Sequence, residues 1–329
     1  MHGLLLALLL AAWPCSGLAA EPMPTLSGNI TIHDPSVIAT ETGWASFATG
    51  VEGAPDDGMP RTKRSPDGIV WEEAGAIPGG LPGWIALELG YTPKNLWAPS
   101  ISSHAGIAYL YYSASSFGRN DSAIGLLTNP AFDPTEPATG WADQGLVLRS
   151  HASDNFNAID PFRIDVDGHA WLAFGSFWDG IRLVSLDPLT GKRLDTAPPH
   201  SIASRGGGAI EAPALLAHDG RFYLFVSFDA CCRGPASTYR IMVGRAEGIE
   251  GLYLDRDGKP MLEGGGTQLL ATSDPYRGPG GEEVFLVGDQ PWLAFHYYDG
   301  YQGGIPRLQV APIGWSADGW PELGALPPR

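Results

Sequence analysis

Short apolar runs, each opening with an aromatic residue and bounded by Gly, Asp, Asn or Pro, recur along the chain. Three runs start ten residues after a proline, and they pair Pro99 with Tyr109, Pro161 with Trp171, and Pro213 with Tyr223. A fourth run starts at Trp44, nine residues after Pro35, and a weaker fifth copy extends from Gly278 to His296. Five copies at a spacing of about 50 to 70 residues indicate a repeated structural unit.

Turn signals stand at equivalent places in these units. Asp167-Gly168 and Asp219-Gly220 begin six residues after the proline of their unit, and His104-Ala105-Gly106 has the same offset after Pro99. Asp257-Gly258 is a further hairpin signal, because Asp-Gly between two apolar runs is typical of a two-residue loop. Helical periodicity is hard to find beyond the N-terminal segment, so the sequence predicts an all-β chain.

Each unit predicts a small antiparallel sheet of about four strands, which cannot bury both of its faces alone. Stacking five such sheets radially gives a five-bladed β-propeller. In this architecture the innermost strand of every blade starts near the central axis. Asp34, Asp160 and Glu211 stand just before the prolines of their units, so we expect them to meet at one end of the axis.

Composition is compatible with one large domain. The chain has 329 residues, of which 44% are hydrophobic and 17% are charged, which is enough for a sizeable core. The formal net charge of −16 argues against nucleic acid or an anionic membrane surface as a partner, because those need clustered Lys and Arg. A neutral substrate remains compatible with this charge.

The N-terminal segment is rich in Leu and Ala and ends in Gly17-Leu18-Ala19-Ala20. Small residues after an apolar run are typical of a secretory cleavage site, so residues 1–20 are predicted to be a signal peptide, although a charged n-region is missing. Residues 21–329 are then expected to form one catalytic domain, secreted to the medium or the periplasm, without a membrane segment. A short membrane anchor is the alternative, but the run is short for a span.

Cys231 and Cys232 are adjacent, and after removal of the signal peptide they are the remaining cysteines. An adjacent pair does not form a disulfide framework. Two alternatives stay open: a vicinal disulfide in an oxidising compartment, or two buried free thiols. Neither cysteine is expected to act as a nucleophile.

Several motifs, taken in order, resemble glycoside hydrolase family 43, and within it the endo-1,5-α-L-arabinanases. The most specific are Asn95–Pro99, Tyr112-Ser113, Ser116–Gly118, Asn155–Pro161, Ser176–Ile181, Cys231–Gly234 and Ser237–Tyr239. The resemblance covers nearly the whole mature chain, from His33 to Pro321. It implies a five-bladed propeller, in agreement with the number of repeats.

Two positions depart from the pattern of this family. Ser100 follows Trp97-Ala98-Pro99, where the family usually has Asp. The fifth unit reads Gly278-Pro279-Gly280-Gly281-Glu282, where the family usually has Gly-Pro-Gly-His-Asn. Because Gly281 replaces a His near the axis, we expect the substrate contacts or the metal environment to differ on that side.

Cleavage of a glycosidic bond needs one carboxyl to protonate the leaving oxygen and a second carboxylate to activate water or attack the sugar. The resemblance assigns Asp34 as general base, Glu211 as general acid, and Asp160 as the residue that raises the pKa of the acid and orients it. A negative Asp160 near Glu211 would disfavour ionisation of Glu211. An acidic residue before proline is often only a turn residue. However, Ala98 at the same place shows that the turn does not require a carboxylate.

Aromatic and polar residues near these carboxyls are candidates for substrate contact. Trp97, Phe117 and Trp178 are expected to offer flat apolar faces to sugar rings, although most aromatic residues in a β-protein belong to the core. The remaining candidates, which would hydrogen-bond sugar hydroxyls, are Asn157, Ser176 and His33.

His296 is the candidate metal ligand, because the resemblance implies a calcium-like ion held on the propeller axis by an equivalent His and several waters. From the residues alone, His296 is more typical of a hydrogen-bonded core histidine, and it is the resemblance that favours the ion. Calcium prefers oxygen ligands, so water would have to supply most of its coordination.

These observations predict a secreted chain of one domain that acts as a monomeric glycoside hydrolase. The resemblance implies cleavage of α-1,5-linked arabinan or arabino-oligosaccharides by single displacement with inversion. The alternatives within the family are an exo-arabinanase, an arabinofuranosidase or a xylosidase. A propeller that binds glycans without cleaving them is the alternative from another class.

Overall fold

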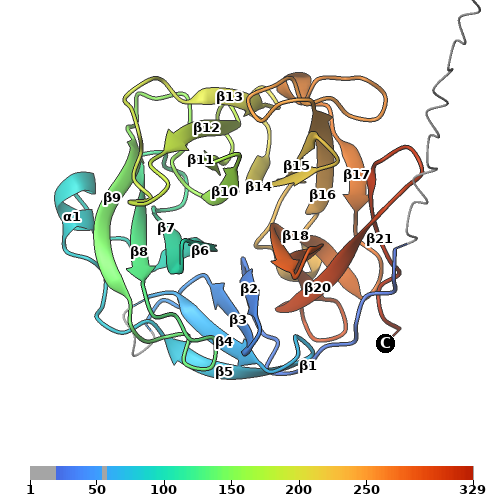
Figure 1. Cartoon of the computed structure of the whole chain (residues 1–329), viewed down its shortest axis with the longest axis horizontal. Coiled ribbons are helices and arrows are strands. Elements are labelled where there is room, and N and C mark those ends of the chain that lie inside the picture. The colour runs from blue at the N-terminus through green and yellow to red at the C-terminus, as the bar shows by residue number, and fades with distance from the viewer. Residues whose placement is uncertain (1–19, 54–57, 329) are drawn as a thin grey trace, which may run out of the picture.

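The computed structural model describes residues 20–53 and 58–328, so residues 1–19 of the predicted signal peptide lie outside the described part. Five sheets are arranged in a ring around a central axis (Figure 1). The predicted all-β, five-bladed β-propeller is therefore confirmed. No helix within the described ranges is long and apolar enough to cross a membrane.

Each of the five sheets is built from consecutive strands of the chain. The first contains β1 (Ser27–Gly28), β2 (Ser36–Thr40), β3 (Gly43–Ala48), β4 (Arg61–Ser65) and β5 (Val70–Ala76). The second contains β6 (Leu96–His104), β7 (Ile107–Ala114), β8 (Ser122–Asn129) and β9 (Ala142–Ser150). The third contains β10 (Phe162–Val166), β11 (His169–Phe174), β12 (Ile181–Leu186) and β13 (His200–Ala203).

The last two sheets follow the same order. The fourth contains β14 (Ile210–His218), β15 (Arg221–Phe228), β16 (Arg240–Ala246) and β17 (Thr267–Leu270). The fifth contains β18 (Tyr276–Val287), β19 (Gln290–Asp299), β20 (Ile305–Trp315) and β21 (Pro321–Leu323). The short helices in the connections are α1 (Trp84–Leu89), η1 (Gly234–Ala236) and η2 (Met261–Glu263). The innermost strands are β2, β6, β10, β14 and β18 (Figure 1).

The first hairpin of three blades turns where the sequence predicts. Val166 pairs with His169 around Asp167-Gly168, and the turns at Ala105-Gly106 and Asp219-Gly220 are equivalent. All six turn residues have positive φ, as a type I′ hairpin turn requires. The prediction for Asp257-Gly258 is wrong: this turn lies in the connection between β16 and β17, where only isolated bridges form, and it joins no two strands of a sheet.

A bend recurs where the inner strands start. The residue before the proline has positive φ in four blades: Asp34 (51°), Ala98 (40°), Asp160 (55°) and Ala212 (52°). Non-glycine residues rarely adopt this conformation, and the surrounding structure must hold them there. The pairing register also shifts between Trp97 and Ser100 and between Glu211 and Ala214. These irregularities re-aim side chains at the strand entry, which is a common use of bulges beside active sites.

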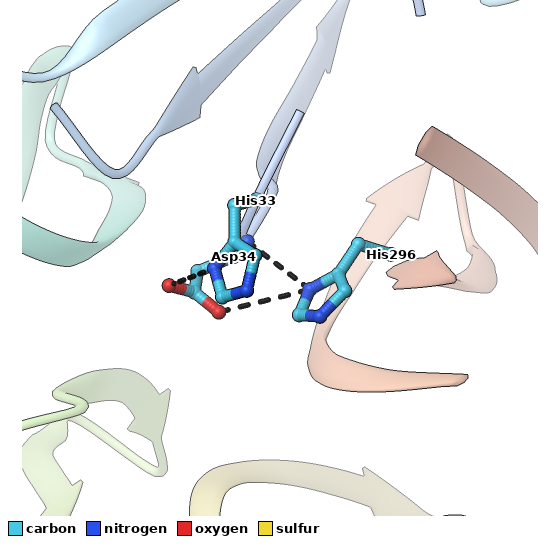
Figure 2. A group of neighbouring side chains, drawn as sticks. All are labelled: His33, Asp34 and His296. Atoms are coloured by element: carbon cyan, nitrogen blue, oxygen red, sulfur yellow. Dashed lines mark hydrogen bonds and ion pairs between the residues drawn. The ribbon is translucent and has the colours of Figure 1, made fainter. Parts of the chain in front are cut away.

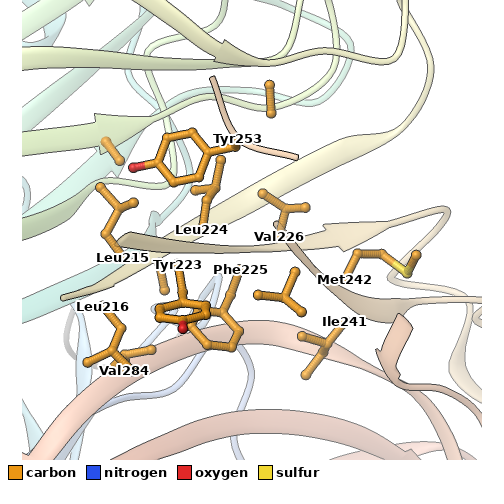
Figure 3. Close-up of a cluster of buried hydrophobic side chains, with 14 of the residues drawn as sticks. Leu215, Leu216, Tyr223, Leu224, Phe225, Val226, Ile241, Met242, Tyr253 and Val284 are labelled. Carbon is orange, nitrogen blue, oxygen red and sulfur yellow. The ribbon is translucent and has the colours of Figure 1, made fainter. Parts of the chain in front are cut away.

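The core lies between the blades. On β15, Tyr223 and Phe225 point to one side of the sheet, and Leu224 and Val226 point to the other (Figure 3). All four are buried, since each blade is covered on both faces by its neighbours. Val284 of β18 belongs to the same cluster, so this cluster joins the fourth blade to the fifth.

Candidate active site

The starts of the inner strands surround one cavity at the propeller axis. Its walls include the four repeated prolines, Pro35, Pro99, Pro161 and Pro213. Asp34, Asp160, Glu282 and Glu283 also line this cavity, and among the described residues no Lys, Arg or His does. The volume of about 40 Å³ has room for at least one water molecule. Residues that are far apart in sequence therefore meet as the repeat predicts.

Asp34 precedes β2 and is held as a carboxylate. Its Oδ2 accepts a hydrogen bond from Thr49 Oγ1 at 2.7 Å and lies 2.8 Å from His33 Nδ1. Burial opposes ionisation of Asp34, but the charge and hydrogen bond of His33 outweigh it and lower the pKa of Asp34 well below its ordinary value. The side chain keeps 22% of its surface exposed, so it can reach a water or a substrate.

Glu211 lies near the start of β14 and is buried. Its Oε2 accepts a hydrogen bond from Ser176 Oγ at 2.6 Å, and its Oε1 accepts one from the Tyr239 hydroxyl. Burial, with the nearby charge of Asp34, raises the pKa of Glu211 to about 7. This carboxyl can therefore carry a proton near neutral pH, as a general acid requires.

Asp160 precedes β10 and lies beside the segment that carries Glu211. Its Oδ2 accepts a hydrogen bond from the Ala212 N–H at 3.1 Å, and its own N–H donates to Ser113 Oγ at 2.9 Å. Burial and the charge of Glu211 raise the pKa of Asp160 well above its ordinary value. The charge of Glu211 thus disfavours ionisation of Asp160, and Asp160 also holds the backbone next to Glu211.

The predicted aromatic residues differ in their exposure to solvent. The rings of Trp97 and Phe117 are 5.2 Å apart between centroids, and Phe117 is 82% exposed. Trp178 is half-buried, and it shares positive φ with its neighbour Phe177, which is exposed. Phe117 therefore has the free apolar face that stacking on a sugar ring needs.

Of the polar candidates, Asn157 has an atom free to bind a substrate hydroxyl, whereas Ser176 and His33 are already hydrogen-bonded to other side chains. Asn157 is buried, and its Oδ1 has no hydrogen-bond partner among the described residues. Ser176 is engaged with Glu211. Both ring nitrogens of His33 are engaged, Nδ1 with Asp34 and Nε2 with the Tyr298 hydroxyl at 2.8 Å. His33 is thus placed to orient Asp34.

His33, Asp34 and His296 offer ligand atoms that lie within 4.8 Å of one another (Figure 2). His33 and Asp34 are already engaged with protein groups, whereas His296 is buried and its Nε2 has no partner among the described residues. Burial lowers the pKa of His296 to about 3, which keeps its ring neutral and able to bind a metal. These residues fit an ion held at His296 Nε2, with water as its other ligands, when the proton of the neutral ring is on Nδ1. In the structure Nδ1 accepts from the Asp34 N–H, so binding of an ion would move that proton from Nε2 to Nδ1.

Gly281 explains how His296 approaches Asp34 so closely. The Asp34 N–H donates to His296 Nδ1 at 3.2 Å. A Cβ at position 281 would lie 2.8 Å from both the His296 ring and Asp34 Oδ1. Gly281 also has a φ of 58°, so a side chain there would be strained as well as crowded.

Several residues of the site were not singled out from the sequence. Tyr239, in the connection between β15 and β16, contacts Glu211, and Tyr298 of β19 contacts His33. Glu282 and Glu283 on β18 are buried at the axis, where Glu282 accepts a hydrogen bond from Ser227. Two adjacent acidic residues inside an apolar strand were the available signal for the last pair.

A buried carboxyl with a raised pKa and a second carboxyl with a lowered pKa, together at the axis of a β-propeller, are the pair of groups that a glycoside hydrolase requires. Residues 23–321 match the profile described as Glycosyl hydrolases family 43, and the chain belongs to this family.

The chain also resembles individual proteins over most of its length. It is 44% identical over 298 residues to the extracellular endo-alpha-(1->5)-L-arabinanase 1 of Bacillus subtilis (strain 168), covering 90% of this chain and 88% of the relative. It is 34% identical over 307 residues to the extracellular exo-alpha-(1->5)-L-arabinofuranosidase ArbA of Cellvibrio japonicus (strain Ueda107), covering 89% and 86%. The solved GH43 endo-arabinanase from Bacillus licheniformis superposes with a TM-score of 0.82 at 42% identity, covering 91% of this chain and 99% of that one.

Proposed function

We propose that the protein is a secreted endo-arabinanase that cleaves α-1,5-linked L-arabinofuranosyl bonds in arabinan with inversion of configuration. The observation that carries this proposal is the division of ionisation at the axis, where Asp34 is held as a carboxylate and Glu211 retains a proton near neutral pH. The endo-acting relatives at 44% and 42% identity support the choice of bond.

In the proposed mechanism Glu211 protonates the oxygen of the leaving sugar. Asp34 accepts a proton from a water molecule as that water attacks the anomeric carbon from the opposite side. Asp160 fixes the backbone beside Glu211 through the Ala212 N–H, and burial with the nearby charge of Asp34 disfavours loss of the Glu211 proton, which keeps the pKa of Glu211 raised. His33 and Thr49 hold Asp34 in position, so Asp34 can accept the proton of the attacking water without rearrangement of its side chain.

Substrate binding is assigned to the residues around these carboxyls. Phe117 and Trp97 form an aromatic pair on which a sugar ring can stack, and Trp178 lies on the third blade. The free Oδ1 of Asn157 can accept a hydrogen bond from a sugar hydroxyl. Because all five inner strands come from one chain, we also propose that the enzyme acts as a monomer.

We propose that His296 holds a calcium-like ion through Nε2, with water as the remaining ligands. Binding moves the ring proton to Nδ1, which then stops accepting from the Asp34 N–H and can donate to Asp34 Oδ1, 3.7 Å away. When bound, the ion would supply positive charge at the axis, where several carboxyls and no basic side chain line the cavity. Removal of ions with a chelator should lower the thermal unfolding temperature, and the His296→Ala variant should lose this response. An unchanged melting curve of the parent after chelation would contradict the proposal.

Exo action is the second candidate, because relatives of that type match nearly as much of the chain. A product profile on linear debranched arabinan separates the two modes. Endo cleavage yields oligosaccharides of several lengths from the start, whereas exo cleavage yields one short product throughout. Following the anomeric configuration of the first product by NMR tests inversion.

Two variants test the assigned carboxyls. Asp34→Asn and Glu211→Gln should each lose activity by a factor of about 10² or more, because each removes one partner of acid–base catalysis. Asp133→Asn is the matched control: Asp133 also precedes a proline, but it is exposed and outside the axis. Full activity in either axial variant would refute the mechanism.

Secretion is proposed because the relatives from Bacillus subtilis and Cellvibrio japonicus are both named extracellular. Expression of the full chain in a bacterial host, followed by N-terminal sequencing of protein from the periplasm or medium, tests it. Recovery of protein that starts near residue 21 is the expected result, and retention of the intact N-terminus in the cell would contradict it.

A further inference from the structure

Cys231 and Cys232 form a disulfide in the connection between β15 and η1. Of the two alternatives left open by the sequence, the structure therefore has the vicinal disulfide. Cys232 is exposed, and its Sγ lies 3.8 Å from His33 Nε2. The disulfide thus borders the site, although the proposed mechanism makes no use of it.

A chain of hydrogen bonds leads from this disulfide to Asp34. The Cys232 N–H donates to the Tyr298 hydroxyl oxygen at 2.8 Å. The same oxygen lies 2.8 Å from His33 Nε2, and His33 Nδ1 lies 2.8 Å from Asp34 Oδ2. These contacts come from three separate parts of the chain.

The directions of these bonds agree with one another. Since the Tyr298 oxygen accepts from Cys232, its own proton is free to be donated to His33 Nε2. A neutral His33 then carries its proton on Nδ1, where it is donated to Asp34. The chain therefore selects the His33 tautomer that supports an ionised Asp34.

The disulfide restrains the backbone that provides the first donor. A bond between adjacent cysteines closes a small ring around their shared peptide, and Cys232 has a φ of 65°, which a non-glycine residue rarely adopts. The rest of the connection is tied independently, by Thr238 to Ala230 and by Ser237 to Arg233. Opening the disulfide would therefore free the Cys232 N–H without releasing the whole segment.

We propose that the Cys231–Cys232 disulfide is a positioning element for the catalytic base, acting through Tyr298 and His33. The proposal rests on the assignment of Asp34 as base. Reduction by a dithiol breaks the S–S bond, gives each sulfur one electron and one proton, and converts the dithiol to its own disulfide. Both forms keep the fold, but the reduced form holds His33 and Asp34 less well.

The test compares the oxidised enzyme with the enzyme reduced by dithiothreitol, using arabino-oligosaccharides as substrate and a titration of free thiols to follow reduction. We expect kcat to fall about tenfold on reduction, in line with a lost orienting contact. KM and the melting temperature should change little, and reoxidation should restore kcat. Equal kcat in both forms, with two titrated thiols in the reduced one, would overturn the proposal.

Two variants separate this role from a general effect of reductant. The Cys231→Ser/Cys232→Ser double variant should have the kcat of the reduced parent and should not respond to dithiothreitol. Tyr298→Phe removes the hydroxyl that links Cys232 to His33, so its kcat should be lowered and nearly independent of reduction. A Tyr298→Phe enzyme as sensitive to reduction as the parent would refute the hydrogen-bond chain.

A measurement without substrate keeps the inference distinct from the proposed function. The imidazole NMR signals of His33, assigned by comparison with His33→Ala, report its tautomer in the free protein. We expect them to move on reduction even if arabinan proves not to be the substrate. Unchanged His33 signals in the reduced protein would refute the role of the disulfide, whereas an oxidised parent inactive on arabinan would refute only the proposed function.

Discussion

Asp34 and Glu211 are both carboxyls at the propeller axis, and their hydrogen-bond partners differ in charge. Asp34 accepts from His33, which becomes cationic when protonated, and from Thr49. Glu211 accepts from the neutral hydroxyls of Ser176 and Tyr239 in a buried position. A charged donor stabilises a carboxylate more than a neutral one does. The opposite ionisation of the two groups thus follows from their immediate partners.

The pH dependence of activity should reflect Glu211. The acid must be protonated to donate, so kcat/KM should fall as pH rises through about 7, the pKa of Glu211. The pKa of Asp34 is lowered, so Asp34 should remain ionised on the acidic side of this range. Rates measured from about pH 5 to pH 9 at constant ionic strength test this expectation. A rate that rises through neutral pH would contradict the roles assigned to the two groups.

Ser176 should tune the same titration. Its hydroxyl donates to the Glu211 carboxylate and so favours the ionised form, which lowers the pKa. In Ser176→Ala the pKa of Glu211 should rise, and the basic limb of the pH profile should move upward by about half a unit or more. Comparison with Ser176→Thr, which keeps a hydroxyl, isolates the hydrogen bond. A limb that moves to lower pH would exclude this role.

At the scale of elements, β18 contains one departure from the family pattern, Gly281, and contacts the other, Ser100 of β6. Glu283 Oε1 accepts hydrogen bonds from Ser36 at 2.7 Å and from Ser100 at 3.3 Å. Ser100 stands where the family usually has Asp, so β6 offers a hydroxyl to the carboxyl that β18 brings to the axis. Ser100, the first departure, therefore contacts the residue that directly follows the second departure, Gly281-Glu282, along β18.

Glu282 on β18 should make the stability of the protein depend on pH. Burial, with the nearby charge of Glu211, raises its pKa to about 8 from an ordinary value of 4.5. Between these values the native state holds a proton that the unfolded state releases, so stability should fall as pH rises from about 5 to 8. Glu282→Gln should be more stable than the parent at pH 8 by about 1 kcal/mol or more.

Chemical unfolding of the parent and Glu282→Gln at pH 5 and pH 8 measures this effect. Glu322→Gln on β21 is a suitable control, because Glu322 is on the same blade and exposed. The control should follow the parent at both pH values. A Glu282→Gln variant that loses stability between pH 5 and pH 8 as much as the parent would show that Glu282 is not responsible.

The positions of Asp34, Asp160 and Glu211 could be predicted because each stands one or two residues before the proline of a repeated unit. Repetition turns sequence position into spatial position, so one inferred axis locates every copy. Tyr239 could not be found in this way, because it meets Glu211 across the strands of its own blade. Nor could Tyr298 and Glu282, because their roles arise from contacts between blades. The side chain that each one meets depends on packing across the ring, which no local pattern encodes.

At the scale of the whole molecule, residues 27–32 tie the first blade to the last. β1 pairs in parallel with β5 at the outer edge of the first sheet. Further along the segment, the Ile30 carbonyl accepts from the Leu308 N–H at 2.8 Å, and the Ile32 N–H donates to the Pro306 carbonyl at 3.1 Å. These bonds close the ring of blades, and the axial carboxyls depend on that closure because they come from several blades.

Gly28 is the residue at which this closure can be tested. It has a φ of 78°, and a Cβ there would lie 2.2 Å from the Trp71 carbonyl oxygen, so Gly28→Ala must displace β1 from β5. We expect a loss of about 1 to 3 kcal/mol in the free energy of unfolding. Gly83→Ala is the control, because Gly83 has negative φ and open space around its Cβ position. Thermal unfolding of both variants measures the difference. If Gly28→Ala melted at the temperature of Gly83→Ala, the pairing of β1 with β5 would contribute nothing to holding the ring together.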